Sequence, residues 1–180
     1  MIILFLDINN KSFLNQSAKL LSINFACWSD IHDAEMEITE CCSDENIMLI
    51  ALENEKVIGL IGANPQYERN VWEMHPLVVS KEARLSGVGK RLVTALESEV
   101  SKKGGITMYL GTDDENNSTS LSNIDIYDNV CDKMKNVKNI NNHPFEFYQK
   151  CGYIVVGVVP DANGFGKPDI MMAKRIQRTV

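Results

Sequence analysis

One segment, from Val71 to Lys102, restricts the fold of this chain more than any other. Its first part, Val71–Val79, predicts a strand with a wholly apolar end, and its last part, Gly89–Lys102, predicts an amphipathic helix. The loop Arg84-Leu85-Ser86-Gly87-Val88-Gly89 lies between them. Glycines let a backbone approach a ligand closely, and the N–H groups at a helix N-terminus bind anions. The segment therefore predicts a strand, loop and helix that hold a phosphate group.

This loop differs from the two best-known phosphate loops. It lacks the G-x-x-x-x-G-K-[S/T] pattern of a Walker loop, and it lacks the third glycine of a dinucleotide fingerprint. Taken alone, R-x-x-G-x-G is more typical of a turn that simply caps a helix. Its identification therefore depends on the residues that follow downstream.

The rest of the chain mixes strands and helices without strict alternation. Short apolar runs predict strands at Met1–Leu6, Asn46–Leu52, Val57–Ala63, Ile106–Leu110, Tyr153–Val159 and Asp169–Lys174. Helical spacing predicts helices at Leu14–Trp28, Ala34–Cys41, Val130–Val137 and from Pro144 to near Gly152. No linker or repeat interrupts the 180 residues. We therefore expect a single domain over residues 1–180, of the α+β class with a mixed sheet.

Charge and composition exclude several classes of partner. The formal net charge of −6 repels nucleic acid and anionic membranes and attracts a cationic small molecule. The five cysteines form no C-x-x-C pair and the three histidines are scattered, so no metal site is expected. The short apolar start is wrongly flanked for a signal peptide, and no stretch is long enough to span a membrane. We expect a cytoplasmic protein.

Several further motifs carry a family resemblance. The paired patterns R-x-x-G-x-G and F-Y-x-K-x-G-[F/Y] resemble the coenzyme A loop and late helix of the GCN5-related N-acetyltransferase superfamily. Five longer runs are similar to the aminoglycoside 6′-N-acetyltransferases: Trp72–Val79, Gly111–Asp114, Thr119–Leu121, His143–Tyr148 and Asp161–Ile170. The resemblance covers nearly the whole chain and is weakest before Val57. It implies a mostly antiparallel sheet splayed for acetyl-CoA and flanked by helices. It also implies direct transfer of acetyl from acetyl-CoA to the 6′-amine of an aminoglycoside, which is an antibiotic-resistance activity.

The resemblance implies roles for three catalytic side chains. Glu73 is expected to bind the ammonium and accept its proton, and His75 to relay that proton or to orient Glu73; both face one side of a strand. Tyr148 is expected to give a proton to the coenzyme A thiolate. The alternatives are a surface carboxylate, a hydrogen-bonded strand histidine and a core aromatic residue.

The cosubstrate is expected to lie along the strand end and the loop. Leu77, Val78 and Val79 resemble the strand end whose backbone pairs with the pantetheine arm, although their side chains fit a core. Residues that should line the pyrophosphate are Arg84, Leu85, Ser86, Gly87, Val88, Gly89 and Lys90.

The acceptor is expected to meet carboxylates and aromatic rings. A polycationic aminosugar needs several carboxylates because each ammonium must be paired as it loses water. Besides Glu73, the candidates are Asp113, Asp114, Asp169, Trp28 and Tyr67. Trp28 fits the core end of the first helix equally well, and Asp169 fits a turn. The long segment Thr112–Asn142 resembles a subgroup insertion that shapes the acceptor site or a dimer contact, and a homodimer is expected from the family alone.

Two other functions stay open. The physiological acceptor could be a polyamine, a peptide or a protein amine, or the chain could be an inactive coenzyme-A-binding module. The presence of Glu73, Tyr148 and the loop together favours an enzyme.

Overall fold

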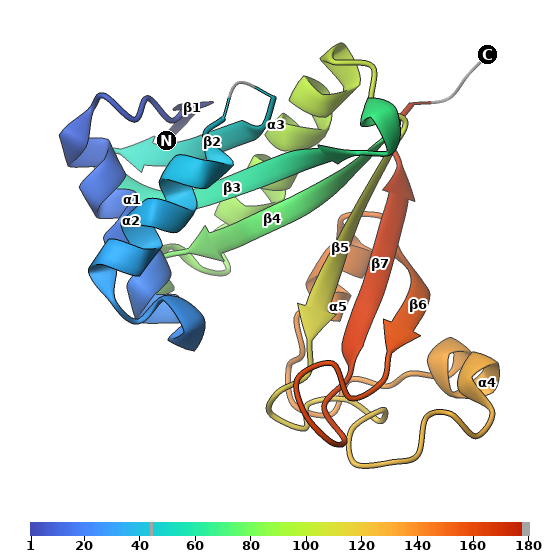
Figure 1. Ribbon diagram of the computed structural model, residues 1–180. Helices are drawn as coiled ribbons and strands as arrows, with labels where there is room; N and C mark the ends of the chain where they lie inside the picture. The colour runs from blue at the N-terminus through green and yellow to red at the C-terminus, as the bar shows by residue number, and fades with distance from the viewer. Residues whose placement is uncertain (44, 178–180) are drawn as a thin grey trace. The chain divides into compact units, whose positions relative to one another are not determined.

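The computed structural model describes residues 1–43 and 45–177, and its chain forms two compact units. Of the described residues, the first unit comprises Met1–Ile106 with Ile176 and Gln177, and the second comprises Thr107–Arg175. Each unit combines strands with helices, which confirms the α+β class (Figure 1). The single-domain boundary stays a prediction.

The first unit is built on four antiparallel strands. These are β1 (Ile2–Phe5), β2 (Ile47–Glu53), β3 (Lys56–Gln66) and β4 (Val71–Val79), each paired with the next. Asn54 and Glu55, between β2 and β3, have φ values of 49° and 62°. Two such residues match the twist of a two-residue hairpin. The predicted hairpin is therefore confirmed, and β4 has the predicted bounds.

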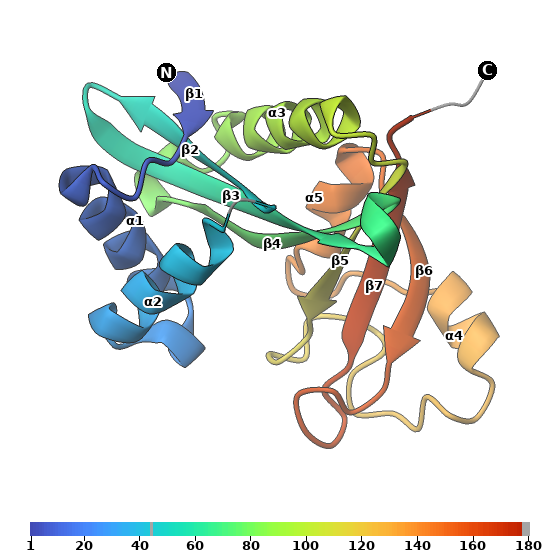
Figure 2. The same cartoon turned by 45° about the horizontal axis from the view of Figure 1, so that its top comes forward.

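Helices cover both faces of this four-stranded sheet. Helices α1 (Lys11–Asn24) and α2 (Ile31–Cys41) lie on one face, and α3 (Val88–Lys102) lies on the other (Figure 2). A strand covered on both faces should be apolar at consecutive positions. In β2 every residue from Ile47 to Leu52 is buried, as that arrangement requires.

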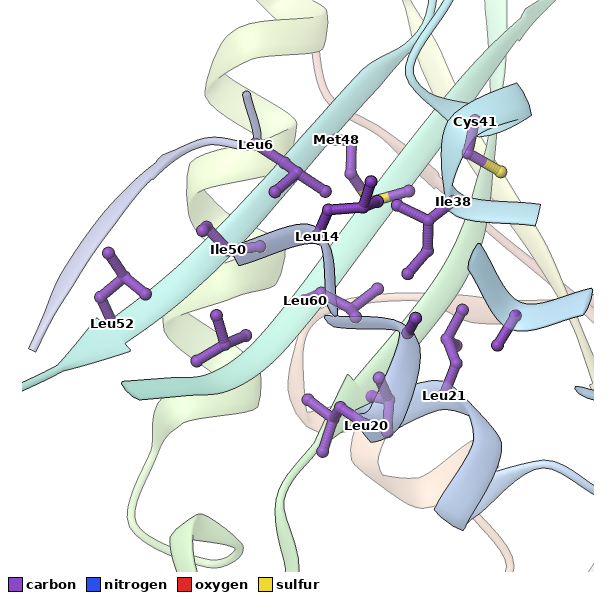
Figure 3. Close-up of a cluster of buried hydrophobic side chains, with 14 residues drawn as sticks. Leu6, Leu14, Leu20, Leu21, Ile38, Cys41, Met48, Ile50, Leu52 and Leu60 are labelled. Carbon is purple, nitrogen blue, oxygen red and sulfur yellow. The ribbon is translucent and has the colours of Figure 1, made fainter. Parts of the chain in front are cut away.

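The core under α1 and α2 is a cluster of aliphatic side chains (Figure 3). Leu14 and Leu21 of α1 and Ile38 of α2 pack there with Leu60 of β3 and Val78 of β4. Transfer of such side chains out of water stabilises the fold by about 1.5–3 kcal/mol each. The apolar stripes of the two predicted helices thus meet the sheet.

Three short 3₁₀ helices connect these elements: η1 (Ala26–Trp28), η2 (Tyr67–Arg69) and η3 (Lys81–Ala83). The first corrects a prediction, because α1 ends at Asn24 and Trp28 lies beyond it. Phe25 is extended between them, at φ −126° and ψ 125°. Trp28 therefore lies outside the first helix, although it is partly buried against the core cluster.

The second unit has three antiparallel strands in the order β5 (Thr107–Asp113), β7 (Asp169–Arg175) and β6 (Ile154–Val159). The predicted pairing of the last two strands is confirmed. Two short helices, α4 (Val130–Lys135) and α5 (Phe145–Lys150), contact β6 and β7 respectively.

The segment between β5 and α5 is long and mostly irregular. A single bridge between Thr119 and Asn139 is its only β pairing among the described residues. The buried carboxylate of Asp114 accepts hydrogen bonds from the backbone N–H of Ser118 at 2.6 Å and of Thr119 at 2.8 Å, and from the hydroxyl of Ser122. One charged side chain thus anchors this segment.

Candidate functional site

The N-terminus of α3 has the features of an anion site. Gly87 precedes the helix with φ 88° and ψ 0°, a left-handed conformation, and no side chain of the described residues caps the helix there. The first N–H groups of a helix have no partner within it. A Cβ placed on Gly87 would meet nothing within 4 Å, so the space beside this glycine is open. The geometry fits a phosphate.

Side chains around the loop hold it in place. Arg84 donates from Nε to the carbonyl of Val79 at 3.1 Å and from Nη2 to Oδ1 of Asn24 at 2.5 Å. Ser86 donates to the carbonyl of Ala83 at 2.6 Å. Arg84 therefore braces the loop against α1 and β4, with further N–H donors left over.

Other loop residues predicted to line the phosphate differ in exposure. Leu85, at φ 61°, and Lys90 are exposed, whereas Gly89 is half-buried and Val88 is buried among the core residues. Val88 can therefore offer a phosphate its backbone rather than its side chain.

The two faces of β4 differ in burial. The side chains of Trp72 and Met74 are buried, whereas Glu73 and His75 are half-buried on the opposite face. The pairing with β3 shifts register between Ile61 and Ala63, opposite the cis bond that joins His75 to Pro76.

The register shift affects the residues expected to meet the pantetheine arm. Val78 packs in the cluster under α1 and α2, and Leu77 and Val79 are half-buried. Val79 pairs with Gly59, whose Cβ position faces Leu92 and Val88 of α3. Val78 therefore belongs to the core, whereas the roles of Leu77 and Val79 stay predictions.

Glu73 lies opposite Asn64 of β3. Directly opposed residues project on the same face of a sheet. Within the described residues the Glu73 carboxylate has no hydrogen bond or ion pair, and Oδ1 of Asn64 is buried without a partner. The Glu73 carboxylate and the Asn64 amide oxygen can therefore each accept from a cation or a water molecule on this face.

His75 contacts residues from two neighbouring elements. Its Nε2 lies 3.3 Å from Oε1 of Glu37 in α2, and its ring meets Trp28 of η1 edge to face at 5.6 Å between centroids. The structure thus brings together two predicted residues, Trp28 and His75, and adds an unpredicted carboxylate. Tyr67, the other predicted aromatic residue, is exposed in η2 at φ 47°.

In the second unit, two predicted carboxylates face each other across a strand pair. Asp113 of β5 is directly opposite Asp169 of β7. Two carboxylates at paired positions give this end of the sheet a negative charge. Asn163 donates from Nδ2 to Oδ1 of Asp113 at 2.5 Å and ties the loop before β7 to this pair.

Asp114 differs from these two carboxylates. Its side chain is 1% exposed and its oxygens accept the three hydrogen bonds described above. Burial acts to raise the pKa of Asp114, but these hydrogen bonds outweigh burial and lower that pKa. The carboxylate turns inward to the protein, so Asp114 is not available to pair with an acceptor ammonium.

Tyr148 lies on α5, whose first turn is held by His143. The Tyr148 ring packs edge to face on Phe147 at 5.1 Å and on Tyr153 at 6.1 Å between centroids. Burial raises the pKa of Tyr148, and the thiol of Cys151 adds to the rise. The hydroxyl therefore keeps its proton at neutral pH.

Two contact residues were missed by sequence reasoning. Glu37 lies 38 positions before His75, and Asn163 lies 50 positions after Asp113. Neither pair has a local spacing signal. Only the helical spacing of Glu37 and Cys41, whose side chains bond at 3.2 Å, was visible in the sequence.

Two further properties concern metals and membranes. Among the described residues, no three His, Cys, Asp or Glu side chains are grouped so that they could hold a metal ion. No helix in residues 1–43 or 45–177 combines the length and apolarity needed to cross a membrane.

Comparison with known proteins bears on the family. The model of the acetyltransferase (GNAT) family matches residues 17–122. No curated protein sequence matches the chain at a significant level.

Three solved structures of aminoglycoside 6′-N-acetyltransferases are similar over the full chain. One, complexed with coenzyme A, is 44% identical at a TM-score of 0.96, covering 100% of this chain and 99% of that one. A second, from Enterococcus faecium, is 44% identical at 0.94 with the same coverage. The third, of type Ii, is 39% identical at 0.80 and covers 100% of both chains. The chain therefore belongs to the GNAT acetyltransferase family and, within it, to the aminoglycoside 6′-N-acetyltransferases.

Proposed function

We propose that this protein transfers acetyl from acetyl-CoA to the 6′-amine of aminoglycoside antibiotics. The observation that carries the proposal is the 44% identity, over the whole chain, to proteins described as aminoglycoside 6′-N-acetyltransferases. The open, uncapped N-terminus of α3 behind Gly87 supports it, because coenzyme A carries a diphosphate that such a terminus can bind.

Residues around α3 bind the cosubstrate in this proposal. N–H groups from Val88 to Lys90 donate hydrogen bonds to the diphosphate oxygens, and the exposed Lys90 adds positive charge. Acetyl-CoA supplies the reactive thioester. Holding it in one orientation supplies much of the rate, because the attack of the amine then needs little further ordering.

Glu73 prepares the amine. Its unpaired carboxylate binds the acceptor ammonium and takes one proton from it, which leaves a nucleophilic amine. The C–N bond then forms as the C–S bond breaks.

Tyr148 acts on the leaving group. Its hydroxyl gives its proton to the departing thiolate, and the second proton lost by the nitrogen restores the phenol. The products are the amide and free coenzyme A, with one proton released to water. No covalent enzyme intermediate is needed.

Acidic and aromatic side chains recognise the acceptor. Asp113 and Asp169, opposite each other in β5 and β7, add negative charge that attracts further ammonium groups. Trp28, beside His75, and the exposed Tyr67 offer aromatic faces to sugar rings. The net charge of −6 favours the approach of a polycation.

We also propose a cytoplasmic homodimer. The cytoplasm holds acetyl-CoA, and β6 is an edge strand with the exposed apolar side chains of Ile154, Val156 and Val159. Light scattering should give twice the 20.2 kDa chain mass, and a monomer at all concentrations would contradict this assembly.

Mass spectrometry of the products tests the activity. With acetyl-CoA, kanamycin or tobramycin should gain one acetyl group, and fragmentation should place it on the 6′-nitrogen. An absence of acetylated drug would reject the drug acceptor. Acetylation of spermidine or of a peptide amine, but of no drug, would establish the alternative acceptors instead.

Glu73→Gln tests the role of the carboxylate. The amide cannot take a proton, so kcat/KM for the drug should fall about 100-fold. The Kd for acetyl-CoA, measured by calorimetry, should stay the same. An equal loss of cosubstrate binding would show that Glu73 has been given the wrong role.

A further inference from the structure

Glu37 of α2 is a carboxylate beside β4 that no sequence motif marked as a site residue. Glu37 lies in the middle of α2, and its Oε1 is 3.3 Å from Nε2 of His75. The two side chains are 24% and 42% exposed, so the contact is partly shielded from water. A pair of this kind holds a ring in one orientation more firmly than a fully exposed pair does.

Glu37 is itself held from within α2. The thiol of Cys41 donates to the same Oε1 at 3.2 Å, one helical turn away. Cys41 is 5% exposed at the margin of the cluster in Figure 3, and burial raises the pKa of its thiol. The thiol therefore stays a donor, and the carboxylate oxygen has a fixed position.

The imidazole of His75 is restrained on a second side. Trp28 meets it edge to face at 5.6 Å, and Phe25 packs on Trp28 in the same way at 5.2 Å. Edge-to-face contacts of this kind favour one relative orientation of the two rings. The imidazole of His75 is thus held between the carboxylate of Glu37 and the indole of Trp28.

This geometry decides which ring nitrogen carries the proton. An ionised carboxylate can only accept, so Nε2 must be the donor. A neutral ring protonated on Nε2 has a free lone pair on Nδ1. No side chain or backbone group in the described residues bonds to Nδ1 of His75.

We propose that Glu37 is a positioning residue that keeps His75 in the tautomer needed to accept a proton at Nδ1. The role rests on the proposed function, in which Glu73 takes a proton from the acceptor ammonium. Glu73 and His75 are two residues apart on one strand face, about 7 Å between Cα atoms, a span that one water molecule can bridge. The O–H bond of protonated Glu73 breaks, an N–H bond forms at Nδ1, and the imidazolium then returns the proton to water.

Nitrogen NMR of the histidine rings tests the tautomer without any acceptor. The wild-type ring of His75 should show a protonated Nε2 and an unprotonated Nδ1. His143 serves as a reference, because its Nε2 bonds to the Asp113 carbonyl and its Nδ1 accepts from the N–H of Phe145. In Glu37→Ala, His75 should show a mixture of tautomers. A proton on Nδ1 in the wild type, or an unchanged spectrum in Glu37→Ala, would overturn the proposal.

Kinetics test whether the position of the ring matters. Glu37→Ala should lower kcat about tenfold and leave the KM for acetyl-CoA unchanged. Glu37→Gln keeps an oxygen that can accept from Nε2, so it should recover most of the rate. In a His75→Ala background, Glu37→Ala should have no further effect.

Glu40→Ala is the matched control, since it removes the same charge from an exposed position of the same helix. It should leave kcat unchanged. An equal loss in Glu40→Ala, or full activity in Glu37→Ala, would rule out a positioning role. The tautomer measurement supports or overturns the contact even where the proposed acceptor is wrong, so the two failures can be told apart.

Discussion

The two units of this protein are stabilised in different ways. In the first, aliphatic side chains fill the space between α1, α2 and the sheet, and Ser17 and Ser80 are the buried polar residues among those described. In the second, a smaller unit, the buried polar residues are Thr112, Asp114, Ser118, Thr119 and His143. The first unit depends on burial of apolar surface, and the second depends as well on satisfied hydrogen bonds.

The difference has a physical reason. A regular element pairs its own backbone groups, so apolar side chains suffice to place it. The irregular segment after β5 cannot pair its own groups, and asparagines at positive φ, such as Asn117, Asn123 and Asn129, shape its turns. A buried carboxylate and a buried imidazole supply the partners that its backbone lacks.

Replacement of Asp114 should destabilise the second unit more than any other change considered. Asp114→Ala leaves buried N–H groups without acceptors, at a cost of roughly 3–5 kcal/mol of unfolding free energy. Hydrogen exchange should speed up mainly between residues 115 and 142. Leu92→Ala, in the core under α3, should cost roughly 2–5 kcal/mol in the first unit.

The loss of stability in these two variants should depend differently on pH. Because the pKa of Asp114 is lowered on folding, its contribution is present above the ordinary value of 3.8 and is lost as pH falls through the folded value. The deficit of Asp114→Ala should therefore shrink in acid, whereas that of Leu92→Ala should not. Equal pH dependence in both would refute the contrast between the units.

Two glycines at opposite ends of α3 separate an effect on cosubstrate binding from an effect on stability. Gly87→Val should weaken acetyl-CoA binding at least tenfold, because a side chain would occupy the open space before α3 and strain the left-handed backbone. Gly104, at the other end of α3, has φ 87° and the same open space. Gly104→Val should cost similar stability and leave the Kd unchanged. Similar Kd values for both variants would show that the phosphate does not bind beside Gly87.

His143 should show the smallest effect. Burial lowers its pKa, although the Asp113 carbonyl opposes the shift. The stabilisation is therefore present above the ordinary value of 6.5 and is lost as pH falls through the folded value. His143→Ala should cost about 1–2 kcal/mol at neutral pH. His143→Asn keeps an acceptor for the N–H of Phe145 and should cost less.

Denaturant unfolding between pH 7 and pH 5 measures the effect. Both His143 variants should lack the part of the pH dependence that the wild type shows in this range. A variant that retains it would exclude His143 as its source.

The elements with strong local patterns could be predicted from the sequence. The bounds of β4 are those predicted, and α3 begins one residue earlier than expected. Trp28 shows the limit of this reasoning, because its helical spacing from Phe25 placed it on a helix that ends at Asn24. Spacing identifies a stripe but not the residue at which the chain turns away.

The sequence by itself determined the α+β class and the family, and it predicts the phosphate loop, because periodicity, glycine positions and motifs are local properties of the chain. Only the tertiary structure decided which carboxylates face inward. Asp114 turns into the protein while its neighbour Asp113 faces Asp169, and Glu37 meets His75 across 38 residues. Such contacts depend on how the elements pack, and the spacing of residues along the chain does not record that packing.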